Sequence, residues 1–421
     1  MCIRKISIDQ LSPGMFIYEL DIPWLQSPFL RHRRKINSEK DVLLLKKAGV
    51  KELFVDLQRG DDLPSENTQA EPIKTEAETE SAAAPESENK VSNSSSEQKT
   101  DEQEKILLNE ELKVAKVLQG KIGKVVHQLG NLVKAGKPIS VTTITPLIDE
   151  AKASLVRNDQ ALLTMLHLHR QDLKLSDHGF GVFAVVLPLA IRLQCTEEQI
   201  NDLGLAALLH DTGWARLPVH LLGKNKAYTS AEQKLVQQHP EIVEKVLIKS
   251  ADVPDNVKKL VKQHHELSDG SGYPKQLKND QVLELVEILQ VADFYDEHLH
   301  GLTDKPGMLP VNVLKQLYQS AKKGLFREAV VSELIHVMGI YPLTSAVKLN
   351  SGEKALVVEI DKQKPLLPQV KIIYEANGDR CMSERIVDLA QSDQDNLRVA
   401  GVIEPLDKKE DPFGLLKVTH V

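Results

Sequence analysis

The first 57 residues combine alternating apolar positions with one short helical pattern. Ile6 and Ile8 alternate with polar residues ahead of a Ser-Pro-Gly turn, and Val, Ile and Leu recur at similar spacing further on. Residues 1–57 are therefore predicted to form a small α+β N-terminal module, with strands around Ile6, over residues 15–20 and 51–56, and a helix over residues 38–48.

Residues 58–104 differ in composition from everything around them. Glu, Ser and Thr dominate this segment, and large apolar side chains are almost absent. Such a segment cannot bury enough apolar surface to offset the entropy lost on ordering. It is predicted to be a disordered acidic linker, for which tethering is the simplest function.

Helical periodicity begins near Ile106. Apolar residues spaced four, three, four and four positions apart predict one buried helix face, made by Leu118, Ile122, Val125, Leu129 and Val133. Docking on its own domain is the ordinary use of such a face, and a coiled coil that forms a homodimer is the alternative. Helical patterns continue to about Gly339, so residues 105–345 are predicted to form a helical domain.

The pattern changes again after Gly339. Short runs rich in Val and Ile alternate with turns that contain Gly, Pro and Asn, and they predict strands over residues 346–349, 354–361, 369–374 and 397–404. Residues 346–421 are therefore expected to form a β-rich appendage. The predicted fold class is mainly α, with a helical core between two smaller parts that contain strands.

Composition narrows the function classes. The hydrophobic fraction is 41% and the net charge is −7, which gives no electrostatic reason to expect binding to a nucleic-acid polymer. The three cysteines form no CxxC pair, which argues against a disulfide framework and against a cysteine zinc site. No stretch reads as a signal peptide or as a membrane span, so the chain is expected to be cytoplasmic and not to contact a membrane.

Histidines and carboxylates gather in the helical region. His210-Asp211 follows an apolar helical run, His264-His265 precedes a Gly-rich turn, and Asp293 lies within another apolar run. Imidazole and carboxylate ligands together suit divalent ions such as Fe, Mn, Zn or Ni. Two such ions can activate water and stabilise the leaving oxygen of a phosphodiester. Each motif alone is more often a surface or helix-end feature, so the separate residues leave a structural role open.

The order of these motifs resembles the HD-GYP family, a branch of the HD-domain phosphohydrolases. The stretch LAALLHDTGWARLP resembles the His-Asp segment of the family, and VADFYDE resembles its closing Asp motif. HHELSDGSGYP nearly matches the signature that names the family, through Gly272, Tyr273 and Pro274. Both ends of the chain also resemble the small N-terminal domain and the β-rich tail that accompany such enzymes in bacteria.

The resemblance implies a metal-dependent phosphodiesterase with an HD-domain helical bundle. Its substrate would be a cyclic dinucleotide, with cyclic di-GMP expected first and cyclic GMP-AMP as the variant. The implied catalytic pair is His210 and Asp211, and Asp211 would bridge two divalent ions, Fe or Mn. Lys224, Gly272, Tyr273 and Pro274 are expected to bind substrate, and the Gly-Tyr-Pro loop is also expected to contact a protein partner. The implied metal ligands are His178, His210, Asp211, His239, His264, His265 and Asp293.

Three positions depart from the family pattern. Trp214 stands where the family usually has a lysine that holds phosphate, and Lys224, Lys226 and Arg216 are the candidates to replace it. Lys174 replaces the glutamate of three-metal members, which favours two ions. Lys305 is the only cation near the place of a missing arginine segment.

These departures leave a second hypothesis, a degenerate member that binds metal, nucleotide or a partner without turnover. A third, a phosphohydrolase for mononucleotides, is disfavoured by the Gly-Tyr-Pro signature. Other residues are given structural interpretations. Trp24 is expected in the core of the N-terminal module, and Thr229 with Glu232 is expected to form a helix capping box. The histidines expected on helix surfaces are His167, His169, His298 and His300.

Overall fold

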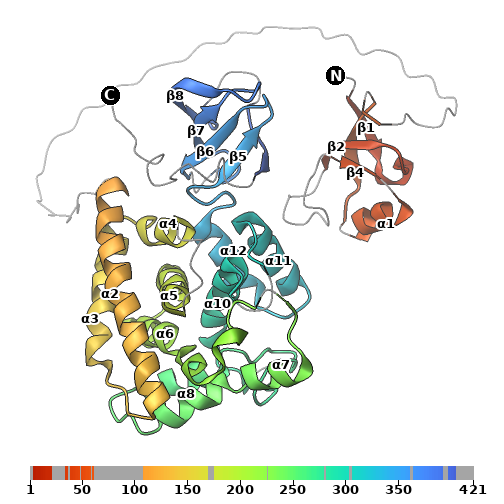
Figure 1. Ribbon diagram of the computed structural model, residues 1–421. Coiled ribbons are helices and arrows are strands. Elements are labelled where there is room, and N and C mark those ends of the chain that lie inside the picture. Colours follow the sequence, from red (N-terminus) through yellow and green to blue (C-terminus); the bar gives the residue numbers. More distant parts are fainter. Residues whose placement is uncertain are drawn as a thin grey trace, which may run out of the picture. The chain divides into compact units, whose positions relative to one another are not determined.

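The computed structural model divides the chain into two compact units, residues 1–104 and 105–421 (Figure 1). It describes residues 3–20, 34–36, 38–47, 49–57, 59–60, 108–168, 175–224, 226–278, 281–302, 306–360, 364–391 and 397–403. Nearly all of the predicted linker, together with Trp24, His169, Lys174 and Lys305, lies outside these residues. Each unit is described by itself.

The first unit contains one antiparallel sheet and one helix. The sheet order is β1-β4-β2-β3, from β1 (Ile3–Ser7), β2 (Phe16–Leu20), β3 (Arg34–Lys35) and β4 (Glu52–Asp56). Ile6, Ile17 and Leu53 point to one side of this sheet and are buried with Leu45 of α1 (Glu39–Lys47). The period-two pattern of apolar residues therefore places one face of the sheet under the helix.

The second unit is mainly helical. Its α-helices are α2 (Leu108–Ala135), α3 (Thr145–Arg157), α4 (Ala161–Leu168), α5 (Leu175–Arg192), α6 (Glu197–Leu209), α7 (Ser230–Val236), α8 (His239–Leu247), α9 (Asp255–Gln263), α10 (Val286–His300), α11 (Pro310–Lys322) and α12 (Glu328–Met338). Short 3-10 turns, η4 (Thr212–Arg216) and η5 (Val219–Leu221), follow α6. The mainly helical fold class predicted from the sequence is confirmed.

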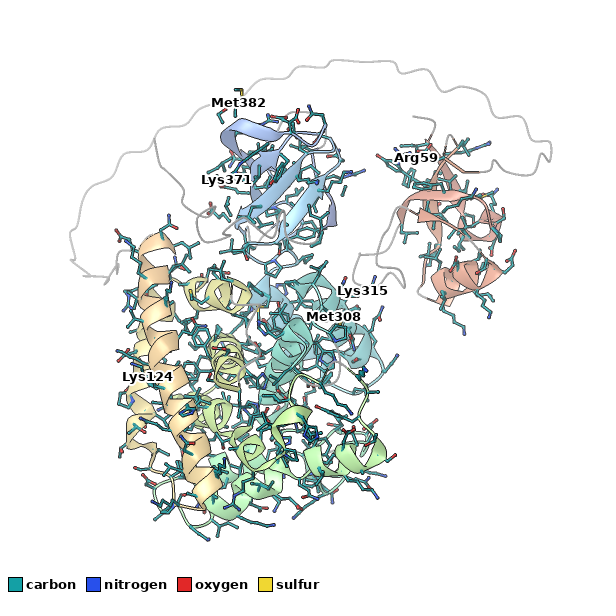
Figure 2. The ribbon with its side chains drawn as sticks, in the orientation of Figure 1. Arg59, Lys124, Met308, Lys315, Lys371 and Met382 are labelled. Atoms are coloured by element: carbon teal, nitrogen blue, oxygen red, sulfur yellow. The ribbon has the colours of Figure 1, made fainter. Side chains whose placement is uncertain are left out.

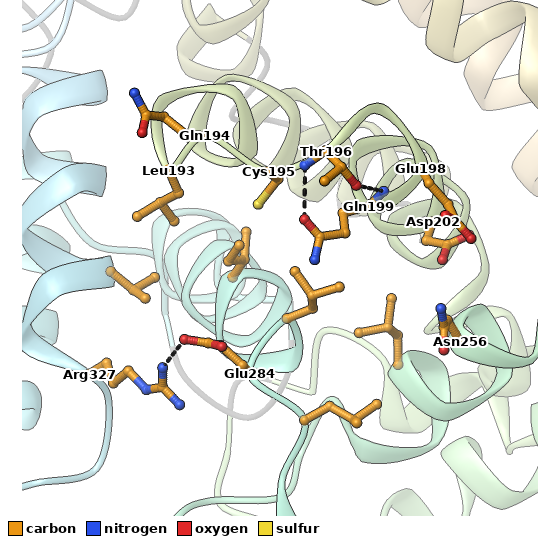
Figure 3. A pocket seen from close by; sticks show the side chains of 15 residues that line it. Leu193, Gln194, Cys195, Thr196, Glu198, Gln199, Asp202, Asn256, Glu284 and Arg327 are labelled. Atoms are coloured by element: carbon orange, nitrogen blue, oxygen red, sulfur yellow. Dashed lines mark hydrogen bonds and ion pairs between the residues drawn. The ribbon is translucent and has the colours of Figure 1, made fainter.

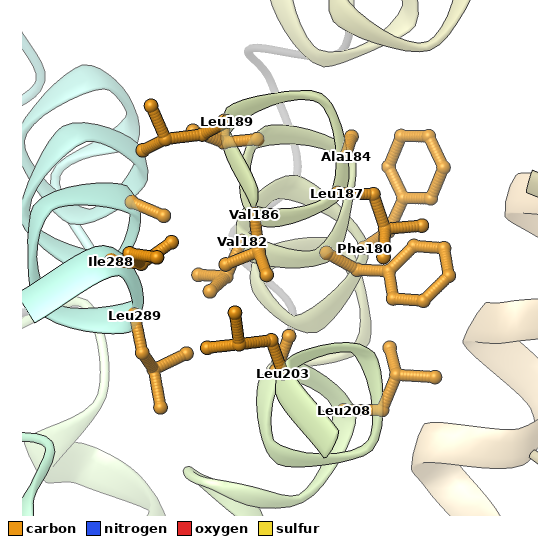
Figure 4. Close-up of a cluster of buried hydrophobic side chains, with 14 of the residues drawn as sticks. Phe180, Val182, Ala184, Val186, Leu187, Leu189, Leu203, Leu208, Ile288 and Leu289 are labelled. Atoms are coloured by element: carbon orange, nitrogen blue, oxygen red, sulfur yellow. The ribbon is translucent and has the colours of Figure 1, made fainter. Parts of the chain in front are cut away.

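Helix α5 lies at the centre of the helical core. Figure 4 shows its side chains pointing to several sides, towards Leu203 and Leu208 of α6 and towards Ile288 and Leu289 of α10. A helix that is apolar on all sides must be covered on all sides. Among the described residues, α5 alone has the length and composition of a membrane span, contrary to the expectation that no stretch does, but 67% of it is buried inside the protein.

Helix α2 packs its apolar face on α5, with one change from the predicted stripe. Val126, rather than Val125, occupies the buried position between Ile122 and Leu129. Gly179 of α5 explains the choice, because a Cβ there would lie 3.2 Å from a methyl carbon of Val126. The glycine lets the two helices approach at this point. The helix ends at Ala135, and Gly136 takes the left-handed conformation that closes such ends.

The C-terminal strands form a five-stranded antiparallel sheet of order β8-β7-β6-β5-β9. Leu356, Val358 and Ile373 of this sheet belong to the same buried cluster as the helices, while its other face has a core of its own. Figure 2 shows Met382 pointing out from the edge strand β8. The strands are β5 (Ala346–Leu349), β6 (Lys354–Glu359), β7 (Gln369–Tyr374), β8 (Arg380–Asp388) and β9 (Val399–Val402).

Candidate metal centre

Five helices bring histidines and carboxylates to one buried centre. His178 lies in the first turn of α5, His239 begins α8, and Asp293 lies in the middle of α10. The other four residues follow the ends of α6 and α9, as the pairs His210-Asp211 and His264-His265. Gly213 permits this convergence, since a Cβ there would lie 2.2 Å from the carbonyl oxygen of His239. All seven residues predicted as metal ligands are therefore brought together.

The seven side chains form two adjoining groups. Asp211, His239, His264 and His265 make the first group, and His178, His210 and Asp293 make the second. Asp211 Oδ1 lies 3.1 Å from His239 Nε2, and its Oδ2 lies 3.4 Å from His178 Nε2. Asp293 likewise reaches both groups, with Oδ1 3.1 Å from His178 and Oδ2 3.9 Å from His265. Each carboxylate thus spans the two groups.

Backbone carbonyls set the tautomer of three histidines. The Nδ1 atoms of His210, His239 and His264 lie 2.9, 2.7 and 2.6 Å from the carbonyl oxygens of Ala207, Val236 and Val261. A carbonyl only accepts hydrogen bonds, so each Nδ1 carries the hydrogen. The Nε2 atoms of these rings are left facing the centre.

The donor atoms fit a divalent cation. His239 Nε2 and His264 Nε2 are 3.0 Å apart, and His178 Nε2 and His210 Nε2 are 3.2 Å apart. Lone pairs that face each other at such distances repel unless a proton or a cation lies between them. Asp211 Oδ1 is also buried without a hydrogen-bond partner. Such a set of imidazole and carboxylate donors is the kind that binds borderline or hard divalent ions.

The charges inside the centre shift the pKa values of its members in opposite directions. Burial opposes ionisation of Asp211, but His210 and His239 outweigh it and hold the pKa of that carboxyl well below its usual range. Burial also opposes protonation of His178, but hydrogen bonds to Asp211, Asp293 and Asp296 hold its pKa well above the usual value. Burial and the neighbouring His264 lower the pKa of His265 well below its usual value. The carboxylates are therefore ionised, as metal ligands must be.

The Gly-Tyr-Pro loop folds back on the histidine pair. The Tyr273 ring stacks on the His265 ring with centroids 4.6 Å apart. The backbone N–H of Tyr273 donates to the backbone carbonyl of His265 at 3.0 Å. Gly272 is needed for this turn, because a Cβ would lie 2.4 Å from the His265 carbonyl oxygen. The buried Glu266 carboxylate holds the far side by accepting from the N–H groups of Lys275 and Leu277. Gly272, Tyr273 and Pro274 thus border the centre.

Comparisons with known proteins match three parts of the chain. Residues 143–328 match an HD domain model, residues 3–144 match a domain of unknown function (DUF3391), and residues 346–407 match a KOW domain associated with HD domains. The HD domain match covers every residue of the centre. Residues 143–328 are therefore similar to the HD domain family, and residues 272–274 carry the Gly-Tyr-Pro signature of its HD-GYP branch.

Proteins similar to this chain include enzymes named for their action on cyclic dinucleotides. A cyclic di-GMP phosphodiesterase of Pseudomonas aeruginosa is 28% identical over 96% of this chain and 93% of its own length. A 3'3'-cGAMP-specific phosphodiesterase of Vibrio cholerae is 33% identical over 22% of this chain and 20% of its own length. A solved HDG"Y"P protein of Bdellovibrio bacteriovorus covers 79% of this chain and 98% of its own, with 17% identity and a TM-score of 0.46.

Trp214 takes the place of the HD-GYP lysine as a packing residue. It is buried with Leu217, Leu221 and Val236, and its ring stacks on His239 with centroids 5.6 Å apart and planes 26° apart. It therefore covers one face of the His239 ring, one of the predicted metal ligands.

Two of the three cations considered as substitutes for that lysine, Lys224 and Arg216, are engaged elsewhere. Lys224 Nζ lies 2.5 Å from Glu232 Oε2, and Arg216 donates to the Val133 carbonyl at 2.8 Å. Glu232 also forms the predicted capping box with Thr229, which is confirmed.

Behind the metal ligands lies a second row of polar residues that the sequence did not single out. Asp296 Oδ2 lies 2.7 Å from His178 Nδ1, and His300 Nδ1 lies 3.0 Å from Asp296 Oδ1. Gly181 makes room for this carboxylate, since a Cβ there would lie 1.9 Å from Asp296 Oδ1. Asp296 follows Asp293 by three positions, so both fall on one helix face, and that spacing is the signal that could have found it.

The expected helix-surface positions of the other histidines need correction. His300 is largely buried through its contact with Asp296. His167 is buried as well, and its Nε2 lies 2.9 Å from the Tyr295 hydroxyl oxygen. His298 is partly buried and stacks on Phe294. The surface prediction was wrong because these helices pack on more than one side.

Proposed function

We propose that this chain is a metal-dependent phosphodiesterase that hydrolyses a cyclic dinucleotide, with cyclic di-GMP as the first candidate. The support for cyclic di-GMP is the relative of that name that aligns along nearly the whole chain. Relatives specific for 3'3'-cGAMP align over a much shorter part, so this nucleotide is the second candidate.

The observation that carries the proposal is the donor set of the centre. Seven side chains from five helices turn lone pairs towards one buried space, at separations that a bound cation would relieve. A protein whose helices needed only to pack would have apolar residues there, since each buried unsatisfied donor or acceptor costs about 1–3 kcal/mol.

The two groups of ligands support a pair of ions, Fe or Mn. Such ions supply Lewis acidity to phosphoryl oxygens and make water more acidic. Asp211 and Asp293 each offer one oxygen to each group, and the Nδ1 hydrogen bonds keep the imidazoles in the ligating tautomer. His210 and Asp211 are thereby proposed as the catalytic pair.

The Gly-Tyr-Pro loop is proposed as one wall of the substrate site. Tyr273 presents an aromatic ring beside His265, where it can support a base or ribose of the nucleotide. Four further points remain proposals from the sequence. They are substrate binding by Lys224, a protein partner at this loop, a homodimer and a cytoplasmic location. The same holds for the boundaries after residues 57, 104 and 345.

The test is hydrolysis of each cyclic dinucleotide by the full chain loaded anaerobically with Fe(II) or with Mn(II). Separation of the products should give a linear dinucleotide, and Asp211→Ala should abolish its formation. Asp255→Asn serves as the matched control, because this exposed carboxylate at the start of α9 lies outside the centre. Hydrolysis that survives Asp211→Ala would overturn the assignment of the centre.

Metal content distinguishes two ions from other counts. Elemental analysis of the anaerobically purified chain should give about two ions, and the seven-ligand set is the reason. A reproducible three would require a further ligand beyond these seven.

A binding protein without turnover is the second candidate, and the packing of Trp214 favours it. The indole on His239 supplies no positive charge for a phosphate, and Lys224 is paired with Glu232. This candidate predicts metal-dependent binding of cyclic di-GMP, measured by calorimetry, with no product under either metal. Turnover by the unaltered chain would exclude it.

A further inference from the structure

A second pocket lies at the ends of the core helices that are remote from the metal centre. Its volume is about 620 Å³, within the range of sites that hold small organic ligands. The turn after α5, the first turns of α6 and α9, the residues leading into α10 and the start of α12 line it (Figure 3). None of the seven metal ligands is among its lining residues.

The same helices serve both places with opposite ends. Helix α5 carries His178 in its first turn and is followed by Leu193 in the pocket, roughly 20 Å further along the helix axis. Helix α6 contributes Glu198 and Asp202 to the pocket and leads into His210 at its other end. The pocket is therefore separate from the site of the proposed function.

One part of the pocket is apolar, and most of the remaining lining is polar. Leucine, isoleucine and valine side chains from four segments form the apolar part: Leu193, Leu260, Leu283, Leu285, Ile288 and Val330. Surface of this kind gains free energy by covering a hydrocarbon group, about 25 cal/mol per Å² of apolar area removed from water.

The rim of the pocket is acidic. Figure 3 shows Glu198 and Asp202 together on one side, and Glu284 with Arg327 on the other. The Arg327 guanidinium pairs with Glu284 and with Glu287, its Nε lying 3.1 Å from Glu287 Oε2. Its positive charge is thus balanced by two carboxylates. What remains is the negative charge of Glu198 and Asp202.

Asp202 is an uncommon rim residue because it is almost fully buried, with 4% of its surface exposed. Burial raises its pKa, a hydrogen bond with Asn256 opposes this, and the neighbouring Glu198 raises it again. A cation placed between two such carboxylates would stabilise their charged forms, which burial and mutual repulsion otherwise disfavour.

We propose that this pocket binds a small amphipathic organic cation, an alkyl- or arylammonium compound. Its ammonium group lies between Glu198 and Asp202, and its hydrocarbon part covers the leucine-rich wall. Both features are required together, because an inorganic cation leaves the apolar wall wet and a neutral hydrocarbon leaves the carboxylates in mutual repulsion.

The test uses three probes that share one hydrocarbon and differ in headgroup charge: 4-phenylbutylammonium, 4-phenylbutanol and 4-phenylbutyrate. Binding to the full chain is measured by calorimetry, with no nucleotide present. The ammonium probe should bind at least about tenfold more tightly than the alcohol, and the carboxylate probe more weakly than the alcohol. Equal affinities for all three probes, or no binding of the ammonium probe, would overturn the proposal.

Two variants locate the binding. Asp202→Asn keeps the side-chain shape and a hydrogen bond to Asn256 but removes the charge, so the preference for the ammonium over the alcohol should fall to about threefold or less. Val330→Phe fills part of the apolar wall and should weaken all three probes. Glu110→Gln, an exposed carboxylate on α2, is the matched control and should change nothing. An ammonium preference that survives Asp202→Asn would place the cation elsewhere.

Discussion

Asp296 orients His178, a proposed metal ligand, without belonging to either group of the centre. It is fully buried, and its Oδ2 accepts the Nδ1 hydrogen of His178, which leaves Nε2 directed at Asp293 and Asp211. Carboxylates in this position typically change metal affinity by 10–100-fold when they are replaced.

Asp296→Asn is therefore expected to lower the affinity for Mn(II) by about 10–100-fold while the chain stays folded. Titration of the metal-free chain with Mn(II), followed by electron paramagnetic resonance, measures this directly. Asp255→Asn is the control, with unchanged affinity expected. An unaltered affinity in Asp296→Asn would mean that ring packing alone holds His178.

Trp214 is a packing residue by its contacts, which changes what its replacement should do. Lysine at this position would match the family pattern, but it would also remove an indole buried against His239, Leu221 and Val236. Large-to-small changes at such sites cost about 3–5 kcal/mol. We expect Trp214→Lys to lower the melting temperature clearly and Trp214→Phe to lower it less. A gain in hydrolysis at unchanged melting temperature would instead favour the lysine as a missing phosphate ligand.

At this scale the sequence indicated the ligands better than their surroundings. Histidines and aspartates at family spacing could be named one by one, and the structure gathers them in one centre. Asp296 and His300 were missed because their role depends on which side of α10 faces α5, and no dipeptide encodes that. The contact between Trp214 and His239 depends in the same way on how η4 packs on α8.

At the scale of elements, helix α11 carries a buried cation. Lys315 is 3% exposed, and burial lowers its pKa to about 8. In the unfolded chain the same group titrates near ~10.4. Between these two values the unfolded chain binds more protons than the folded chain, so stability rises as pH increases through this window. Below pH 8 the charged lysine is a cost to the fold.

Lys315→Met removes this cost. The variant is expected to be more stable at pH 7, by on the order of 3 kcal/mol at most, and the gain should shrink at pH 10, where the folded lysine is already neutral. Urea unfolding at the two pH values measures both quantities. Lys323→Met, an exposed position at the end of the same helix, should show little change at either pH. A gain that is equal at pH 7 and pH 10 would assign the effect to packing instead of charge.

Elements with strong periodicity were predicted closely, and weak ones were not. Strands β5 and β7 have the predicted bounds, because apolar residues dominate both and turn-forming residues border them. Strand β8 was missed, since its sequence mixes Arg, Met, Ser and Glu and its exposed side chains include Met382 and Ile386. On α2, both Val125 and Val126 fit a period of 3.6, and only the approach of Gly179 decides between them.

On the scale of the whole molecule, the C-terminal sheet is joined to the helices by a shared core. Leu356, Val358 and Ile373 pack in the cluster that also contains α5 and α10. The sequence predicted an appendage there because the periodicity changes from helical to strand-like, which resembles a domain boundary. Periodicity does not show that one face of the sheet packs on the helices. Residues 105–421 consequently form one compact unit.

This shared core gives a prediction for limited proteolysis. Cleavage requires a locally unfolded segment of chain, and a segment within a continuous core becomes accessible only by partial unfolding. Residues 58–104 have few large apolar groups to bury, so trypsin should cut first at Lys74, Lys90, Lys99 or Lys105, positions outside the described residues. A stable fragment of about 35 kDa should accumulate, the share of the 46.9 kDa chain that follows residue 105.

Gel electrophoresis over time with mass spectrometry of the fragments provides the measurement, and digestion in urea, which opens the core, is the control. If the sheet were independent of the helices, cutting between residues 339 and 346 would instead release a second small fragment at an equally early time.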